Sequence, residues 1–254
     1  MPKVLILILS TTDQRYQEFI TACKNTWVQR AEQSFVDCIF YQGGAPNDIL
    51  ELNELKLAVD DSLGGTGIKL FRALEYIERF GIEYDYIYRT NLSSYIFMDN
   101  FINWTKTIAN EDLYAGVVIQ ANMNDRWPYR FMRRLAERFY PENHIPFASG
   151  AGFCISRKNV QLMLADAKLD LRWVDDVMVG ECLYRHGIKI VPVSRIDFNG
   201  DSISYHANAS GKIKQMEHCF HIRCRSKDRA RDAARFYELD GCANYTDFEN
   251  LLIT

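Results

Sequence analysis

The sequence predicts an α/β fold in which helices flank a central, mostly parallel mixed sheet, and three observations lead to this prediction. Val4–Leu9 is a continuous aliphatic run, as is typical of a strand buried on both faces of a parallel sheet. Asp13–Arg30 repeats apolar residues at helical spacing, and Phe35–Tyr41 has the composition of a second strand. A strand, a helix and a strand in this order favour a right-handed crossover between parallel strands.

Later helices are marked by apolar residues three or four positions apart and by capping residues at their ends. We expect these helices at Ile68–Phe80 with Gly81 as C-cap, at Met98–Ile108, after the capping residue Ser156, at Trp173–His186 before Gly187, and at Lys227–Leu239.

Later strands are marked by short runs of β-branched and aromatic residues. We expect these strands at Tyr84–Tyr88, Leu113–Gln120, Phe153–Ser156, Ile188–Val193 and Cys219–Cys224. The remaining segments are Leu52–Val59, which fits a short strand or a short helix, Pro146–Gly152, a loop of small residues, the irregular stretch from Arg195 up to Cys219, and the apolar turn Phe248–Ile253.

Nothing in the sequence divides the chain. Its 254 residues hold no internal repeat, no low-complexity run and no linker, so we expect a single domain over residues 1–254. The net charge of −3 gives no overall attraction to nucleic acid or to an anionic membrane, and we expect neither as a partner. No apolar run is long enough to cross a bilayer, so no membrane insertion is expected.

The seven cysteines are scattered, and no two form a Cys-x-x-Cys pair, which argues against zinc-ribbon and thioredoxin-like sites. Most lie within apolar runs, as buried free thiols do, and this indicates a reducing compartment. Val4–Leu9 is too short for the apolar part of a signal peptide. We therefore expect a cytoplasmic protein.

The segment Met123–Tyr140 interleaves arginines with aromatic residues. Nucleic-acid-binding proteins use such interleaving, and a cleft for a polyhydroxylated or anionic ligand can use it equally well. Because the chain has no basic balance overall, we favour the cleft.

The stretch Tyr84–Phe97 combines a predicted core strand with a polar segment that directly follows it. Its first part is a strand, and Arg89–Ser94 then forms a cluster of polar, turn-prone side chains. Ligands of open α/β sheets bind outside the carboxyl ends of the strands, so this cluster is a candidate binding region, together with Ser10 and Thr11 after the first strand. An ordinary Asn/Ser turn and simple helix capping explain the same residues.

Two motifs carry a resemblance to a known family. Residues 173–180 are Trp-Val-Asp-Asp-Val-Met-Val-Gly, and residues 149–156 before them are Ser-Gly-Ala-Gly-Phe-Cys-Ile-Ser. The pair resembles the Glu-Asp-Val-x-x-Gly motif and its preceding glycine-rich stretch in β-1,3-glycosyltransferases of the galactosyltransferase/Fringe type. Residues 86–93, Tyr-Ile-Tyr-Arg-Thr-Asn-Leu-Ser, stand where that family has a strand, a basic residue and an Asp-x-Asp metal motif. Lys69 resembles the lysine of its Thr-x-Lys, with Gly67 in place of the threonine.

The resemblance implies a GT-A fold with a nucleotide-binding half at about residues 1–97 and an acceptor-binding half at about residues 98–254. It also implies an inverting hexosyl- or pentosyltransferase of glycan biosynthesis. Its donor would be a nucleotide-sugar, with a UDP-sugar favoured, and its acceptor a hydroxyl of a glycan or glycoprotein. Many relatives are Golgi enzymes with a membrane anchor and disulfides. This sequence shows neither feature, so we expect a bacterial cytoplasm, or a host cytoplasm if the protein is viral.

The resemblance carries the catalytic base to Asp176, with Asp175, in place of the family's Glu, as its orienter or substitute. Inverting transfer needs a base that deprotonates the acceptor hydroxyl. Backbone N–H groups at a helix N-terminus favour an ionised carboxylate, so we expect Asp176 to be ionised. Helix capping explains either aspartate equally well.

The acidic metal motif is replaced by Asn91, Leu92 and Ser93. The resemblance implies Mn²⁺ or Mg²⁺ at the donor diphosphate, and neutral ligands predict a weaker metal dependence than in relatives with Asp-x-Asp. Two routes stay open: a metal held by the phosphates with help from His221, or cationic side chains in its place. The candidate cations are Lys69, Arg89, Arg223 and Arg225.

The donor-binding residues implied by the resemblance lie after the predicted strands and in the glycine-rich stretch. They are Ser10, Thr11, Lys69, Arg89, Thr90, Asn91, Ser93, Gly150, Ala151, Gly152, Arg223 and Arg225. Two alternatives to a transferase remain. One is a catalytically inactive GT-A-like protein that binds a nucleotide or carbohydrate, which the missing acidic motif motivates. The other, ranked last, is a nucleotidyltransferase, for which the glycine-rich signature after the first strand is absent.

Overall fold

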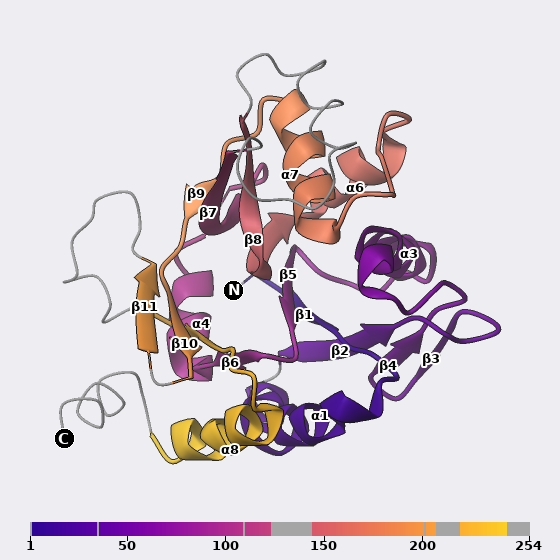
Figure 1. Ribbon diagram of the computed structural model, residues 1–254. Coiled ribbons are helices and arrows are strands. Elements are labelled where there is room, and N and C mark those ends of the chain that lie inside the picture. Colours follow the sequence, from indigo (N-terminus) through magenta and orange to yellow (C-terminus); the bar gives the residue numbers. More distant parts are fainter. Residues whose placement is uncertain are drawn as a thin grey trace.

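The computed structural model describes residues 2–34, 36–108, 110–122, 144–200, 202–206 and 219–242. The segments Met123–Tyr140 and Phe248–Ile253, for which the sequence suggested a ligand cleft and an apolar turn, lie outside these residues. The described chain has the predicted mixed α/β architecture, with helices on both sides of a central sheet (Figure 1).

The central sheet has eight strands. They are β1 Val4–Leu9, β2 Asp37–Gln42, β3 Ile49–Glu51, β4 Glu54–Lys56, β5 Tyr86–Asn91, β7 Tyr114–Asn122, β8 His144–Ser156 and β9 Val191–Pro192. Their order is β3-β4-β2-β1-β5-β8-β7-β9. β1 is parallel to both β2 and β5, whereas β8 runs antiparallel to β5 and β7. The sheet is therefore parallel in its centre and mixed towards one edge.

A second, four-stranded sheet lies beside the first. It contains β6 Ser94–Ile96, β10 Arg195–Asn199, β11 Ser202–His206 and β12 His221–Cys224, in the order β11-β10-β12-β6. β5 and β6 are consecutive strands of different sheets, joined by the turn at Leu92 and Ser93. The two sheets therefore meet at this turn.

The α-helices in the described ranges are α1 Gln17–Cys23, α2 Gln29–Gln33, α3 Thr66–Arg79, α4 Met98–Thr105, α6 Arg157–Ala165, α7 Asp175–Arg185 and α8 Arg229–Asp240. In Figure 1, α1 and α8 lie together below the strands, and α3, α6 and α7 lie above and to the right. Ser156 caps α6 as predicted, because its Oγ accepts the Asn159 N–H at 3.3 Å. In the described residues, no helix has both the length and the apolar character that a bilayer crossing requires.

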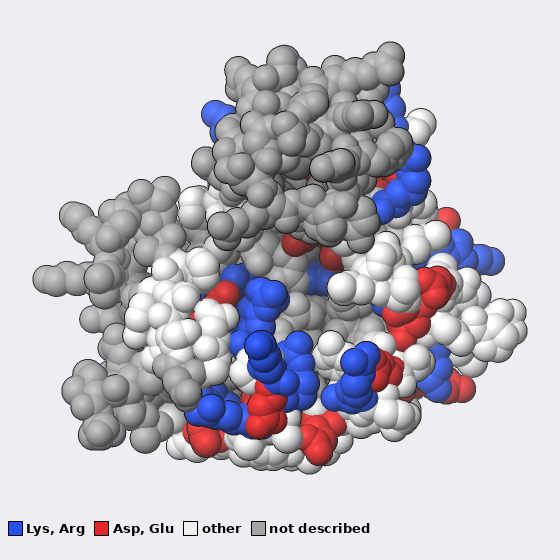
Figure 2. Space-filling view, viewed as in Figure 1, with Lys and Arg blue, Asp and Glu red and all other residues white. Residues whose placement is uncertain are grey.

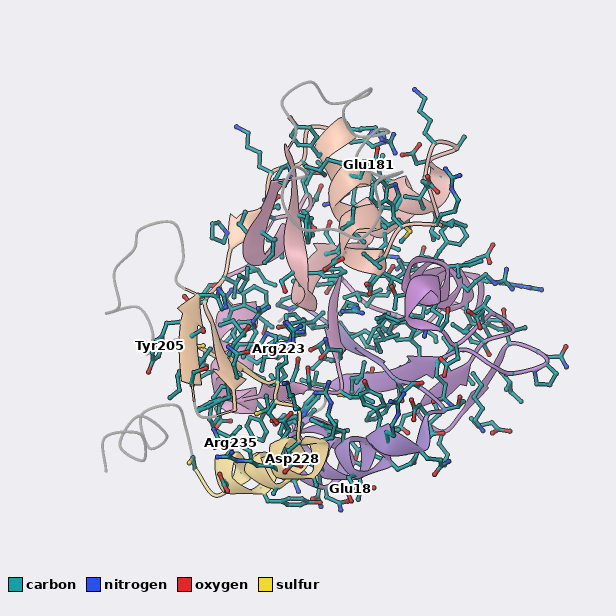
Figure 3. All side chains as sticks on the ribbon, in the orientation of Figure 1. Glu18, Glu181, Tyr205, Arg223, Asp228 and Arg235 are labelled. Atoms are coloured by element: carbon teal, nitrogen blue, oxygen red, sulfur yellow. The ribbon has the colours of Figure 1, made fainter. Side chains whose placement is uncertain are left out.

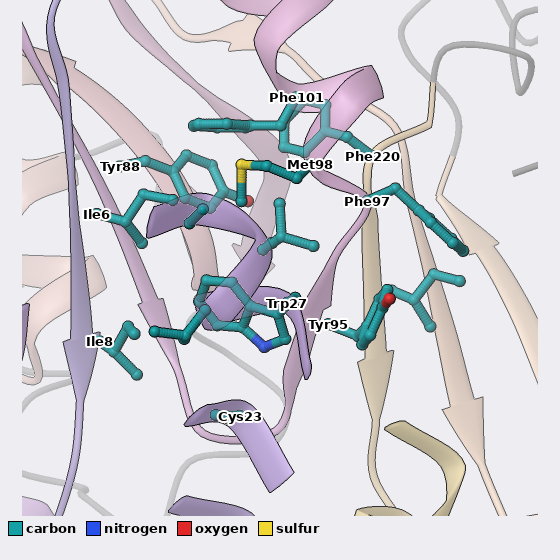
Figure 4. Close-up of a cluster of buried hydrophobic side chains, with 14 of the residues drawn as sticks. Ile6, Ile8, Cys23, Trp27, Tyr88, Tyr95, Phe97, Met98, Phe101 and Phe220 are labelled. Atoms are coloured by element: carbon teal, nitrogen blue, oxygen red, sulfur yellow. The ribbon is translucent and has the colours of Figure 1, made fainter. Parts of the chain in front are cut away.

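The core consists of two apolar clusters on opposite faces of the central sheet. Ile6 and Ile8 of β1 belong to one cluster and Leu5 and Leu7 to the other, so β1 is buried on both faces, as its unbroken aliphatic run predicted. In the first cluster Trp27 lies between the β1 side chains Ile6 and Ile8 and Tyr95 of β6, with Tyr88 of β5 and Met98 of α4 above it in the view (Figure 4). Apolar side chains thus cover the sheet on both faces.

Two helical predictions change in detail. Asp13–Arg30 is a broken helix, because a π-helical segment at Lys24–Val28 separates α1 from α2 and Thr26 has non-helical backbone angles. The Thr26 hydroxyl donates to the Ala22 carbonyl at 2.6 Å, which satisfies one of the acceptors freed by the break. The undecided segment Leu52–Val59 contains the strand β4.

Three strand predictions change more. β5 runs on to Asn91, because Arg89 and Thr90 are buried and paired with β1 and β8. Pro146–Gly152 is not a loop but part of β8, where Gly152 pairs with Thr90 and Ala148 with Val118. Small residues suit this part of the strand because other side chains approach it closely.

The stretch after Arg195 is not irregular, since it begins with the antiparallel strands β10 and β11. Gly200, at φ +68°, lies between them in the left-handed conformation that glycine adopts without strain. Arg195 and Asp197 looked like loop residues, yet both are buried and paired with each other. These two charged residues made the segment resemble a loop in the sequence, although their ion pair allows them to be buried in a strand.

Candidate active site

The predicted site residues converge where the strand order reverses. β1 leads to β2 on one side, and β5 pairs with it on the other. Ligands of open α/β sheets bind at such a reversal, at the carboxyl ends of the strands. The space-filling view shows this face hollowed near its centre, with Lys and Arg side chains below and to the left of the hollow and acidic atoms at its upper border (Figure 2).

Arg89 and Asp175 form a buried ion pair between β5 and the first residue of α7. Both side chains are almost fully buried, and Arg89 Nε also donates to the Tyr41 hydroxyl at 3.1 Å. Burial alone would lower the pKa of Arg89, but the charge of Asp175 and the hydrogen bond to Tyr41 outweigh it and raise that pKa. Asp175 is therefore committed to a guanidinium and does not face the hollow as a free base.

Asp176, the next residue, is only partly buried. Its Oδ2 accepts the Gly150 N–H at 2.8 Å, and its Oδ1 accepts the Val177 N–H at 2.9 Å. Burial and the charge of Asp175 nevertheless raise the pKa of Asp176 to about 6. The helix terminus therefore does not lower the pKa of Asp176, but a carboxyl group with a pKa of about 6 is still mostly ionised at neutral pH. A carboxylate with this pKa is suited to accept a proton near neutral pH.

The glycines of β8 lie against the chain's own functional side chains. A Cβ on Gly150 would stand 2.8 Å from Asp176 Oδ2. A Cβ on Gly152 would stand 2.4 Å from the Tyr88 hydroxyl and 2.5 Å from His221 Cε1. The bare backbone at both positions therefore allows these side chains to reach the strand, while a donor-binding role for Gly150, Ala151 and Gly152 stays a prediction.

The turn that replaces the acidic motif is closed by its own hydrogen bonds. Asn91 Oδ1 accepts from the Ser93 N–H at 3.1 Å, from the Ser93 hydroxyl at 2.7 Å and from the Ser94 hydroxyl at 3.3 Å. Thr90 is buried, and its hydroxyl donates to the Ala151 carbonyl at 2.7 Å. These side chains join β5, β6 and β8 at the point where the two sheets meet.

Comparison with known proteins identifies the family. A model of the galactosyltransferase family matches residues 54–194, which is more than half of the chain. The chain belongs to the galactosyltransferase family. It is a glycosyltransferase with a GT-A-like fold, as the resemblance implied.

A solved structure with a similar fold is that of a glycosyltransferase involved in the glycosylation of the major capsid of PBCV-1. The two chains are 8% identical, the match covers 93% of this chain and 100% of that chain, and the TM-score is 0.50. No curated protein matches the chain. The family match includes Lys69, Arg89 and both aspartates at the start of α7. Ser10, His221, Arg223 and Arg225 lie outside it.

In this glycosyltransferase, Lys69 and Thr11 are brought together by Asp61, which the sequence did not single out. Lys69 is buried, and its Nζ lies 3.0 Å from Asp61 Oδ1, while the Thr11 hydroxyl donates to Asp61 Oδ2 at 2.8 Å. The same carboxylate accepts the Thr12 N–H at 2.8 Å and the Gly43 N–H at 3.0 Å. Burial would raise the pKa of Asp61, but these hydrogen bonds lower it to about 2. Asp61 therefore ties the loops after β1 and β2 to α3.

Ser10 lies next to this network, at the end of β1. Its side chain is buried, and its N–H donates to the Tyr41 carbonyl at 2.8 Å. The β1 residue before it, Leu9, pairs with Asn91 of β5. Ser10 is thus adjacent to the β5–β6 turn, as predicted from its position after the first strand.

His221 is fully inside the protein. Its Nδ1 lies 2.9 Å from the Tyr88 hydroxyl, and its Nε2 has no hydrogen-bond partner among the described residues. Burial, followed by the charge of Arg195, holds the pKa of His221 well below its usual range, so the ring is neutral at neutral pH. A neutral imidazole can bind a metal, but here it stands beside arginines.

Arg195 is a site residue that the sequence did not reveal. It is buried, its Nη1 donates to the Ser149 hydroxyl at 2.8 Å, and its Nη2 lies 3.0 Å from Asp197 Oδ2. The alternation of Arg195-Ile-Asp197-Phe is the signal that could have exposed the strand. Arg223 is partly buried on the neighbouring strand, and Arg225 is exposed just beyond it.

The donor set at the β5–β6 turn does not fit a divalent cation. Mg²⁺ and Mn²⁺ prefer carboxylate, carbonyl and water oxygens, and Asn91 Oδ1 already accepts three hydrogen bonds. Asp197 is neutralised by Arg195, and Asp175 by Arg89. The nearby cations Arg195 and Arg223 would repel a metal at His221.

Another cluster of potential ligands lies at the far end of α7. Asp166, Cys182 and His186 place one ligand atom each within 4.8 Å of one another. However, Arg185 Nη2 lies 2.7 Å from the same Asp166 oxygen, which both lowers the Asp166 pKa and neutralises its charge. The guanidinium of Arg185 therefore occupies the position that a metal ion would need at this cluster.

Proposed function

We propose that this glycosyltransferase moves a sugar from a nucleotide-sugar, with a UDP-sugar favoured, to a hydroxyl of a glycan or glycoprotein, with inversion at the anomeric carbon. The observation that carries the proposal is Asp176, a partly exposed carboxylate at the sheet's point of reversal whose pKa is raised to about 6. Its neighbour Asp175 forms an ion pair with Arg89, whereas Asp176 has no such partner among the described residues.

In the proposed reaction Asp176 accepts the proton of the acceptor hydroxyl. The acceptor oxygen forms a bond to the anomeric carbon on the face opposite the leaving group. The bond from that carbon to the diphosphate oxygen breaks, and its electron pair leaves with the nucleoside diphosphate. A positioned base contributes about 10²–10⁴-fold to the rate of such a step.

The donor's nucleotide is proposed to lie across the carboxyl ends of β1 and β5, near Ser10 and Thr90. This assigns donor binding to about residues 1–97 and acceptor binding to about residues 98–254. The reversal of strand order between β1 and β5 supports this placement. The Asp61 network supports it too, because it fixes the loops that border the same edge.

A cytoplasmic location is part of the proposal. Its support is a set of buried cysteines that form no disulfide among the described residues. They include Cys23, Cys38, Cys154, Cys182, Cys219 and Cys224. Burial raises the pKa of thiols such as Cys23 and Cys154, which makes them unreactive.

The proposal is tested by incubating the protein with a panel of nucleotide-sugars and sugar acceptors. We expect release of nucleoside diphosphate together with a new glycosidic bond, and NMR of the product should show the anomeric configuration opposite to that of the donor. Retention of configuration would refute inversion. Binding of nucleotide-sugars without any turnover across the panel would instead identify an inactive binding protein.

A further inference from the structure

The face of the small sheet that borders the site carries polar and charged side chains. His221 and Arg223 alternate along β12 with Ile222 and Cys224, which are buried in the apolar core. Alternating residues of a strand point to opposite faces, so His221 and Arg223 share the face opposite the core. In the neighbouring strand β10, Asp197 pairs with Arg223 in register.

Arg223 lies directly beside the turn that replaces the acidic motif. Its register partner on β6 is Ser94, and the next residue, Cys224, donates its N–H to the Ser93 carbonyl at 2.8 Å. The side-chain view labels Arg223 in the space between β10 and β5 (Figure 3). A basic side chain thus stands where relatives are expected to hold a metal.

The positive charge of this face is not balanced by the described residues. Arg195 is matched by Asp197, and Arg89 by Asp175. Within the described ranges no carboxylate lies within ion-pairing distance of Arg223 or Arg225, and Arg223 Nε is buried without a hydrogen-bond partner. A buried donor without an acceptor is costly, and an anion that enters the hollow would satisfy it.

The electrostatics agree with this geometry. Burial, followed by the charge of Arg195, lowers the pKa of Arg223 to about 10; Asp197 opposes this shift, and Arg225 and Arg89 add to it. Arg223 stays charged at neutral pH but carries a repulsion that a bound anion would relieve. Arginine is the side chain that best matches a phosphate, because its planar guanidinium donates two parallel hydrogen bonds.

We propose that Arg223, with Arg225 at its rim, holds the diphosphate of the donor in place of a divalent cation. This inference rests on the proposed function, since it assigns a partner to the leaving group of that reaction. The side chains neutralise the charge that develops on the diphosphate oxygen when its bond to the sugar breaks, as fixed donors do at other developing anions. His221 and Arg195 are the buried residues next to Arg223 on β12 and β10.

The experiment measures binding of inorganic diphosphate and of UDP by calorimetry, with EDTA and then with Mg²⁺ or Mn²⁺. We expect the wild-type protein to bind both ligands in EDTA, with an affinity that either metal changes by less than about threefold. Arg223→Gln should weaken binding in EDTA about tenfold or more, because it removes a charged hydrogen-bond donor. Arg223→Lys, which keeps the charge but not the fork, should recover only part of the loss.

The matched control is Lys158→Gln, which removes one positive charge at the opposite edge of the sheet. Lys158 is exposed and follows the end of β8, where Ser156 pairs with Tyr86, whereas Gly152 pairs with Thr90 at the site. It should bind diphosphate as the wild type does. If Arg223→Gln does not fold, judged by circular dichroism, the exposed Arg225→Gln takes its place and should weaken binding by a smaller factor.

Two results would overturn the inference. One is wild-type binding that is absent in EDTA and appears only with metal, and the other is unchanged affinity in both arginine variants. The panel of nucleotide-sugars separates this outcome from the proposed function. Turnover that requires a metal would refute the arginine site and support the proposed transferase activity. Arginine-dependent diphosphate binding without any turnover would support the arginine site and refute the proposed transferase activity.

Discussion

The two sides of the site are built on the same unit, a buried arginine–aspartate pair, and differ in what is added to it. Where α7 meets β5, two carboxylates lie near one guanidinium: Asp175 forms an ion pair with Arg89, and Asp176 forms none with it. In the small sheet the ratio is inverted, because Asp197 pairs with Arg195 and Arg223 is left over. The comparison teaches that each side of the site has one charged residue in excess of its ion pair, and these two residues are the ones to which we assign the proposed roles: Asp176 as proton acceptor and Arg223 as anion-binding residue.

The largest effect should come from removing the excess carboxylate. Asp176→Asn keeps the size of the side chain but cannot accept a proton, so the turnover number should fall roughly 10²-fold or more while nucleotide affinity stays near normal. Steady-state kinetics and calorimetry on the same preparation measure both quantities. Asp175→Asn is assayed in parallel. A severe loss of turnover in Asp175→Asn with only a mild loss in Asp176→Asn would identify Asp175 as the base.

Breaking the buried pair should act on stability more than on chemistry. Asp175→Asn leaves Arg89 as a buried charge without its partner, and we expect a loss of about 3 kcal/mol in the free energy of unfolding. Urea denaturation measures it. Asp170→Asn is the matched control, because its partner Arg172 is 72% exposed and an exposed ion pair contributes less than about 1 kcal/mol. Equal losses in the two variants would show that the Arg89 pair is not special.

The pH profile should report the raised pKa of Asp176. Because this group must be ionised to act as a base, kcat/KM should fall about tenfold per pH unit below a pH of about 6 and level off above it. Asp175→Asn removes a negative charge that raises this pKa, so in that variant the fall should begin at lower pH. An unchanged midpoint would mean that another group controls the profile.

The smallest effect concerns the turn between the sheets. Asn91→Asp combined with Ser93→Asp restores two carboxylates at the positions of the acidic motif, and Mn²⁺ should then bind measurably more tightly in the absence of substrate. Calorimetric titration with Mn²⁺ compares the double variant with the wild type. No change in affinity would show that this turn does not correspond to the metal motif of the relatives.

Local patterns were sufficient for much of the fold. Val4–Leu9, the helix at Asp175–Arg185 and its stop before Gly187 were predictable, because each depends on neighbours in the chain. The strand character of Pro146–Gly152 was not, since its small residues accommodate side chains from α7, β5 and β12. The residues of the strand alone do not record that requirement.

For the site, too, the sequence predicted what depends on neighbours in the chain but not what depends on contacts made by folding. Asp176 followed from a family motif, but its pKa is set by its burial and by Asp175, which only the folded chain defines. Arg195 escaped notice because its partner Ser149 lies far away in the sequence. Asp61 escaped for the same reason, since it gathers hydrogen bonds from loops that the sequence separates.

The carboxylate of Asp61 has a consequence for how this enzyme can be re-engineered or can diverge. Because one side chain accepts N–H groups from the loops after β1 and β2 and an ammonium from α3, these segments cannot be exchanged one at a time. A loop grafted from a relative would leave the buried lysine Lys69 or the partly buried carboxylate of Asp61 without its partners. Change at this edge of the sheet must therefore be concerted, with the loops and α3 replaced as one block.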